Sequence, residues 1–173
     1  ELYGSRSNGK GDFAMSKWKI ITTWAPTISG VRVAAEALRG GVSALDGVET
    51  ALRVAEEDEN CKCVAYGGEA NEDGVVQVDA GLMDGRDFSV GSVAGMVNYL
   101  HPITVARHVM EKTQHVLLVG EGAERFARAC GEEPRDLLTP ETRANWEKRA
   151  AERDAKATGH DTASALVLDA DGN

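Results

Sequence analysis

The sequence contains no long hydrophobic run and few residues of several informative kinds. Aromatic residues make up 5% of the 173 residues, and there are three cysteines and four prolines. No apolar stretch approaches the length of a membrane span, so we expect no membrane partner. The net charge of −9 argues against nucleic acid as the main partner, because phosphate binding favours a basic surface.

Several ligand-binding motifs are also absent. The nineteen glycines form neither a phosphate-binding P-loop nor a strand–GxGxxG–helix unit. The four histidines do not lie at His-x-x-x-His spacing on one helix. Cys61 and Cys63 are separated by one residue, which is closer than the usual spacing of a metal-binding cysteine pair. We expect both to be thiols near the start of a buried strand. We therefore expect no cofactor and no metal.

The hydrophobic content of 42% is enough for a packed core, and the length suits one domain. Residues 1–16 are rich in glycine, serine, asparagine and lysine, which predicts a flexible leader or an expression remnant. We place the folded domain at residues 17–173.

Segments with the patterns of strands and helices alternate along this domain. We expect strands at 18–24, 63–66, 75–78, 116–119 and 162–168. We expect helices at 30–39 with Ser29 as cap, after Ser43, and at 104–112, 121–130 and 141–156. Residues 91–99 indicate a short helix or a loop, and the acidic residues 56–59 indicate a solvated face. The pattern predicts an α/β or α+β fold.

The string His160-Asp161-Thr162 stands just before the last expected strand. A free N-terminal threonine can supply its own general base, because its α-amine accepts the proton of its hydroxyl. Taken alone, such a string is more often a loop that leads into a strand. It gains weight from four motifs that precede it in order: TTW at 22–24, YGGEANE at 66–72, VDAGLMDG at 78–85 and TQHVLLVGE at 113–121.

Together these motifs resemble the glycosylasparaginase family of N-terminal nucleophile hydrolases, over about residues 18–173. The resemblance implies an α+β fold, a four-layer αββα sandwich. It also implies that the domain is incomplete. Residues 17–161 would be part of an α-subunit and residues 162–173 the start of a β-subunit. The resemblance also implies that complete αβ units associate as a homodimer.

The resemblance implies self-cleavage between Asp161 and Thr162, after which Thr162 is the catalytic nucleophile. His160 would orient the loop or only pack there. Trp24 matches a family tryptophan that lines the substrate site, although a core aromatic is the alternative. The implied substrate is a small molecule, a glycosylated asparagine or an asparagine-like compound. The family's other catalytic residues follow the nucleophile and are not in this sequence, so we expect the chain alone to be inactive.

Two features favour the glycosylasparaginase branch over plant-type asparaginases and isoaspartyl peptidases. Those relatives usually carry Gly-Thr at the cleavage point, where this chain has Asp161-Thr162, and a His-Gly-Gly segment where it has Thr23-Trp24. Hydrolysis of asparagine or β-aspartyl peptides remains an alternative. A non-catalytic fragment that binds a partner through an open sheet edge is another.

Overall fold

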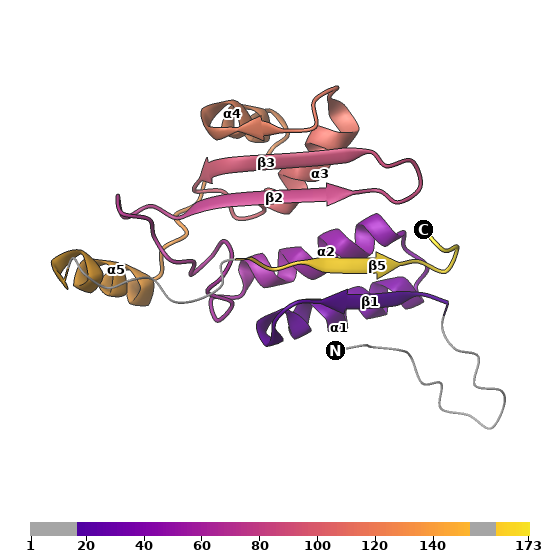
Figure 1. Ribbon diagram of the computed structural model, residues 1–173, viewed down its shortest axis with the longest axis horizontal. Coiled ribbons are helices and arrows are strands. Elements are labelled where there is room, and N and C mark those ends of the chain that lie inside the picture. Colours follow the sequence, from indigo (N-terminus) through magenta and orange to yellow (C-terminus); the bar gives the residue numbers. More distant parts are fainter. Residues whose placement is uncertain (1–16, 153–161) are drawn as a thin grey trace.

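The computed structural model describes residues 17–152 and 162–173 (Figure 1). Helices and strands alternate along the described chain, and the strands form two separate sheets. The elements are β1 (Lys19–Thr22), the 3-10 helix η1 (Ala25–Thr27), α1 (Ile28–Arg39), α2 (Ala44–Glu57), β2 (Gln77–Met83), β3 (Val90–Val97), α3 (Pro102–Lys112), β4 (Leu118–Val119), α4 (Gly120–Ala129), α5 (Pro140–Glu152) and β5 (Ala165–Leu168).

One sheet pairs strands from opposite ends of the described chain. β1 runs antiparallel to β5, with Lys19 opposite Leu168 and Thr22 opposite Ala165, and the two lie side by side in Figure 1. Residues alternate between the faces, so Ile20 is buried while Ile21 is 45% exposed. α1 and α2 cover the buried face. We call β1, β5, α1 and α2 the β1–β5 layer.

Small residues let the two helices of this layer approach each other closely. The core contains Trp18, Ile20, Val31, Ala34, Ala35, Leu38 and Ala51. Gly30 of α1 lies against the α2 backbone, and a Cβ there would be 2.1 Å from the carbonyl oxygen of Ala51. Only glycine therefore fits at this crossing.

The second sheet has the order β2-β3-β4, and α3 and α4 pack against it. β2 and β3 form an antiparallel pair with an irregularity between Val78 and Ala80, and β3 pairs with β4 in parallel. We call these three strands with α3 and α4 the β2–β4 layer. Its core is built mainly from larger side chains, among them Val93, Met96, Tyr99, Ile103 and Leu137.

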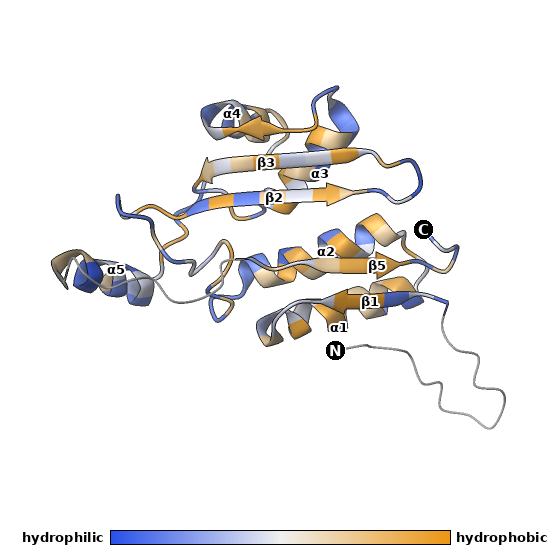
Figure 2. Cartoon of the chain, in the orientation of Figure 1, coloured by the Kyte–Doolittle hydropathy of each residue, from blue (hydrophilic) through white to orange (hydrophobic). Residues whose placement is uncertain are grey.

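Charged side chains connect the two layers where α2 meets α3. Arg107 of α3 lies 2.8 Å from Asp46 Oδ1 and 2.7 Å from Glu49 Oε2, both on α2. α5 lies apart from both sheets, and Figure 2 shows that it is mostly hydrophilic.

Most of the expected elements are confirmed, with shifted ends, but three expectations are wrong. Residues 90–97 form strand β3, not a short helix or loop; the small residues are needed because α3 packs directly on Gly91, where a Cβ would be 2.1 Å from the Ala106 carbonyl oxygen. Residues 63–66 form turns, not a strand. Ser29 lies inside α1 and does not cap it, because the N-cap of α1 is Thr27.

The cap at Ser43 is confirmed, as Ser43 and Asp46 form a reciprocal capping box at the start of α2. Among the described residues, no helix is long and apolar enough to cross a membrane. The fold is thus mixed α/β, with two sheets that each carry helices. The four-layer αββα sandwich and the division at residue 162 stay predictions.

Candidate active site

A cleft of about 1150 Å³ lies between the two layers and contains both Trp24 and Thr162 in its walls. The β1–β5 layer contributes Trp24, residues 162–164 and part of α2. The opposite wall is formed by β2, residues 60–70 and the start of α3. The two sequence-predicted residues that the structure describes therefore line one cavity. His160 and Asp161 lie outside the described residues.

The β1–β5 pairing explains how Trp24 and Thr162 come to share the cleft. Hydrogen bonds continue past the last paired residues, since Thr23 N donates to Ser164 O at 3.0 Å and Ser164 N donates to Thr23 Oγ1 at 3.0 Å. The chain segments that carry Trp24 and Thr162 therefore leave the ladder at the same end. Thr162 is exposed to solvent in this position.

The backbone at Trp24 adopts a conformation that is unusual for a residue with a side chain. Its φ of 66° lies in the left-handed region, where a bulky residue is rare and strained. The side chain is 48% exposed at the cleft, so Trp24 is not a core aromatic. This geometry fits a residue that presents its ring to a ligand.

A buried carboxylate that the sequence analysis missed also lines the cleft. Glu56 is 5% exposed, so its assignment to a solvated acidic face is wrong. It follows Leu52 by four residues on the apolar side of α2, and that spacing is the signal that could have placed it.

Glu56 pairs with His101 at the start of α3. Its Oε2 lies 3.2 Å from His101 Nδ1, and its Oε1 accepts a hydrogen bond from Ile103 N at 3.1 Å. Burial raises the pKa of Glu56 to about 7, although the bond to His101 opposes the shift. On its other side, His101 Nε2 lies 3.1 Å from Glu57 Oε1. The pair links α2 of one layer to the start of α3 of the other, beside the cleft.

The rim of the cleft is attached to α5 by two ion pairs. Lys62 pairs with Glu141, and Arg149 pairs with Glu69. α5 is the last described element before residues 153–161.

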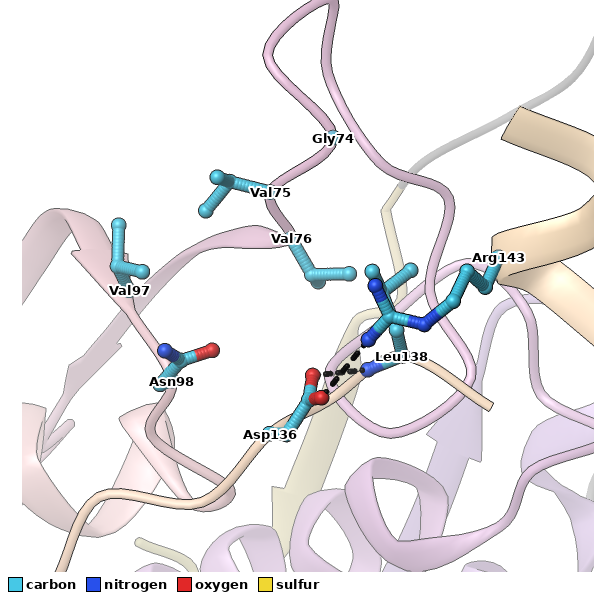
Figure 3. A pocket seen from close by; sticks show the side chains of 8 residues that line it. All are labelled: Gly74, Val75, Val76, Val97, Asn98, Asp136, Leu138 and Arg143. Carbon is cyan, nitrogen blue, oxygen red and sulfur yellow. Dashed lines mark hydrogen bonds and ion pairs between the residues drawn. The ribbon is translucent and has the colours of Figure 1, made fainter. Parts of the chain in front are cut away.

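A second, smaller pocket of about 250 Å³ contains none of the predicted site residues (Figure 3). The two charged side chains that line it form an ion pair, with Arg143 Nη2 2.9 Å from Asp136 Oδ2. Asp136 Oδ1 also accepts a hydrogen bond from Leu138 N at 3.0 Å. We assign it a structural role. Within the described parts of the chain, no group of three or more His, Cys, Asp or Glu side chains is arranged to hold a metal ion.

Comparison with known proteins identifies the family to which this cleft belongs. A family model described as asparaginase matches residues 9–171. The chain belongs to the asparaginase family. This is a family of Ntn-type amidohydrolases, and it includes the glycosylasparaginases that the motifs resemble.

Relatives of this asparaginase-family chain carry several names. It is 40% identical to an N(4)-(beta-N-acetylglucosaminyl)-L-asparaginase from Elizabethkingia miricola, over 89% of this chain and 46% of that protein. It is 38% identical to a rat isoaspartyl peptidase/L-asparaginase, over 79% of this chain and 43% of that protein. A plant-type L-asparaginase from Thermococcus kodakarensis is 46% identical over 70% of this chain and 40% of its own length. The chain thus spans about half the length of these relatives or less.

Proposed function

We propose that this chain is a precursor of an N-terminal nucleophile amidohydrolase, and that Thr162 becomes its nucleophile. The observation that carries the proposal is the placement of Thr162 and Trp24 in the walls of one cleft, in a chain of the asparaginase family. The exposure of Thr162 supports the same role, because a nucleophile must be reachable by water and substrate.

The proposed first reaction is self-cleavage. The Thr162 hydroxyl attacks the carbonyl carbon of Asp161, the acyl group moves from nitrogen to oxygen, and water hydrolyses the resulting ester. The Asp161 carboxylate takes or relays the hydroxyl proton, and His160 orients the loop. The products are a new carboxyl group on Asp161 and a free α-amine on Thr162.

The α-amine then acts as the base in substrate hydrolysis. An α-amine has an ordinary pKa of about 7.7–8.0, so a substantial fraction is neutral near pH 7.5. It accepts the proton of the Thr162 hydroxyl, which attacks the side-chain amide of N4-(beta-N-acetylglucosaminyl)-L-asparagine. A β-aspartyl ester forms, the amino sugar leaves, and water releases aspartate. Trp24 contacts the substrate at the side of the cleft.

The second candidate is hydrolysis of L-asparagine or β-aspartyl peptides by the same nucleophile. The names of the rat and Thermococcus relatives favour it. Asp161-Thr162 and Thr23-Trp24 favour glycosylasparagine, as does the Elizabethkingia relative, whose match covers 89% of this chain. In either case we propose that a β portion completes the site and that αβ units associate as a homodimer. A binding module without catalysis is the outcome if cleavage fails.

The test is intact mass spectrometry of this chain and of the complete open reading frame that contains it. Wild type, Thr162→Ala and Thr162→Ser are expressed side by side. We expect the complete wild-type protein to split between Asp161 and Thr162, the alanine variant to stay intact, and the serine variant to split more slowly. A complete wild-type protein that stays intact would overturn self-processing.

Substrate choice is tested on the cleaved protein. The glycosylated asparagine, free asparagine and a β-aspartyl dipeptide are supplied at equal concentration, and released aspartate is measured. We expect the highest kcat/KM for the glycosylated substrate. A higher kcat/KM for either of the others would assign the second candidate function.

A further inference from the structure

Two thiols lie next to each other at the cleft, where Cys63 lines the wall and Cys61 is buried behind it. Cys61 Sγ and Cys63 Sγ are 3.4 Å apart, and neither cysteine is in a disulfide. A disulfide bond has a length of about 2.05 Å, so small rotations of both side chains would bring the two sulfurs to bonding distance. Among the described cysteines, Cys130 is on α4's C-terminal end, away from this pair in the sequence, and provides a natural control.

The backbone holds the two thiols in this arrangement. Cys61 N donates to Asp58 O at 2.8 Å, and Val64 N donates to Cys61 O at 3.3 Å. The second bond closes a turn across residues 61–64, which brings the side chains of Cys61 and Cys63 to the same place. Lys62, between them, is anchored to Glu141 of α5.

The two thiols differ in their access to solvent. Cys61 is fully buried, whereas Cys63 is partly exposed and lines the cleft that contains Thr162. Burial, together with the neighbouring Cys63 thiol, raises the pKa of Cys61 to about 12. A reagent that enters the cleft therefore meets Cys63 first, and Cys61 stays protonated until a reaction occurs beside it.

We propose that Cys61 and Cys63 are a redox-active pair, in which Cys63 reacts first with a small-molecule disulfide and Cys61 then displaces it to form an intramolecular disulfide. The sequence spacing alone indicated only two free thiols, and the 3.4 Å separation of the two sulfurs is what changes that view. The pair is independent of whether Thr162 is a nucleophile.

The chemistry is balanced with oxidised glutathione as the oxidant. The Cys63 thiolate attacks one sulfur of glutathione disulfide, that S–S bond breaks, and one glutathione leaves as its thiolate. Cys61 then gives up its proton to water and attacks Cys63 Sγ, which releases the second glutathione. The two protein thiols lose two electrons in total, and one glutathione disulfide is reduced to two glutathiones.

Formation of this bond would alter the cleft. The Cys63 sulfur would be drawn toward buried Cys61 and away from the cavity that Thr162 and Trp24 also line. The oxidation state of the pair would therefore change the shape of the cavity without a change in the β1–β5 ladder.

Peptide mapping of the full chain tests the proposal. The protein is equilibrated with mixtures of oxidised and reduced glutathione, quenched with acid, alkylated and digested with trypsin. Trypsin cleaves after Arg53, Lys62 and Arg86, so the two cysteines fall in separate peptides, 54–62 and 63–86. We expect these peptides to be linked in the oxidised sample and separate after reduction.

Matched variants assign the order of events. In the Cys61→Ser variant the reaction should stop at a glutathione adduct on Cys63. In the Cys63→Ser variant, Cys61 should react with glutathione disulfide at least about tenfold more slowly than Cys63 does in the wild type. Cys130→Ser should form the linked peptides as wild type does.

Three results would overturn the proposal: a wild type whose peptides never link while the Cys63 adduct persists, linkage only between two chains, or Cys61 that reacts at the wild-type rate in Cys63→Ser. The wild-type map decides the question even if a variant fails to fold. The intact masses of the same samples report cleavage before Thr162 separately.

Discussion

The two layers assemble their strands in different ways. In the β2–β4 layer, β2 and β3 are neighbours in the sequence, joined by residues 84–89. In the β1–β5 layer, β1 and β5 come from opposite ends of the described chain. Closing so long a loop costs more conformational entropy than closing a hairpin, and such contacts form later in folding. The candidate site is therefore built at the place where the fold depends most on a distant pairing.

The cores differ as well. Three of the seven core residues of the β1–β5 layer are alanines, which allows its helices to pack closely. Only four of the fifteen residues in the other core are alanines, and that core contains larger side chains such as Tyr99 and Met96. Each layer nevertheless has one glycine at its tightest contact, Gly30 in the first and Gly91 in the second. The β1–β5 layer thus relies on few large side chains, of which Ile20 is one.

The largest expected effect is that of Gly91→Ala. Its Cβ would lie 2.1 Å from Ala106 O and 2.6 Å from Met110 N, so α3 would have to leave the sheet. We expect a loss of more than about 3 kcal/mol in the free energy of unfolding, measured by urea denaturation. Gly30→Ala meets only the backbone around Ala51, and two helices can separate slightly, so its loss should be smaller, about 2 kcal/mol.

Gly122→Ala is the control for both variants. It lies in α4, and a Cβ there has no neighbour within 4 Å. Alanine should raise stability by up to about 1 kcal/mol because of its higher helix propensity. If Gly91→Ala were as stable as Gly122→Ala, the close packing of α3 on β3 would be wrong.

The next effect is expected for Ile20→Ala. Ile20 is 1% exposed and faces α1 and α2, so its truncation should cost about 3 kcal/mol. The neighbouring Ile21 points to the other face of β1 and is 45% exposed, so Ile21→Ala should cost less than about 1 kcal/mol.

Hydrogen exchange of the Ile20→Ala variant tests whether the two layers unfold separately. The amides of Thr23 and Ser164 should exchange faster, while those of the β2–β3 pair should keep more of their protection, because sub-global opening follows separate cores. Equal loss of protection in both layers would mean that they unfold as one cooperative unit.

The comparison of layers also shows which parts of the fold could be predicted. Helix α2 and its cap were readable from Ser43 and the spacing of apolar residues, because these signals are local. Strand β3 was missed because Gly91 and its small neighbours lack strand propensity, and the reason for them, the approach of α3, is not visible in the sequence.

The candidate site was predicted only in part, for a similar reason. Trp24 and Thr162 were named from motifs, but their common cleft depends on the pairing of β1 with β5, which no local pattern specifies. The contact between Cys61 and Cys63 was missed because it depends on how the loop after α2 turns back. Glu56 was missed although its spacing from Leu52 on α2 is a local signal for burial. The roles of Thr162, Asp161 and His160 stay predictions.

The Glu56–His101 pair joins the two layers, and it makes stability depend on pH. Burial raises the pKa of Glu56 from 4.5 to about 7. Between these values the folded state binds more protons than the unfolded state, so this contribution is fully present below about pH 4.5 and is lost as the pH rises through 7. We expect a loss on the order of 2–3 kcal/mol in the free energy of unfolding over this range.

Glu56→Gln removes this titration. The amide oxygen can still accept from Ile103 N, and the amide nitrogen can donate to His101 Nδ1, so the variant should equal or exceed the wild type in stability at pH 7. Glu57→Gln, the exposed partner of His101 Nε2, should keep the wild-type pH dependence. Urea denaturation from pH 4.5 to 7.5 measures both. A Glu56→Gln variant with the wild-type pH dependence would contradict the assignment.

The smallest expected effect concerns the turn that carries Trp24. The buried Thr27 hydroxyl lies 2.7 Å from Thr23 O, 2.8 Å from Trp24 O and 2.8 Å from Thr22 Oγ1. The Thr27 hydroxyl has one proton, which it can donate to either carbonyl oxygen or share between the two. The Thr22 hydroxyl can donate its own proton to Thr27 Oγ1. Thr27→Val keeps the shape but removes these bonds, and should cost about 1–2 kcal/mol in urea denaturation.

Thr27→Ser distinguishes the hydroxyl from the packing of the side chain. Serine retains the hydroxyl, so the amide exchange of Thr27, whose N donates to Trp24 O at 3.2 Å, should stay close to that of the wild type. In Thr27→Val the same amide should exchange faster, because Trp24 is then free to relax from its φ of 66°. If valine were tolerated and serine were not, methyl packing rather than the hydroxyl would hold the turn. Apolar packing in the β1–β5 layer, and not hydrogen bonds from Thr27, would then hold Trp24 in its strained conformation.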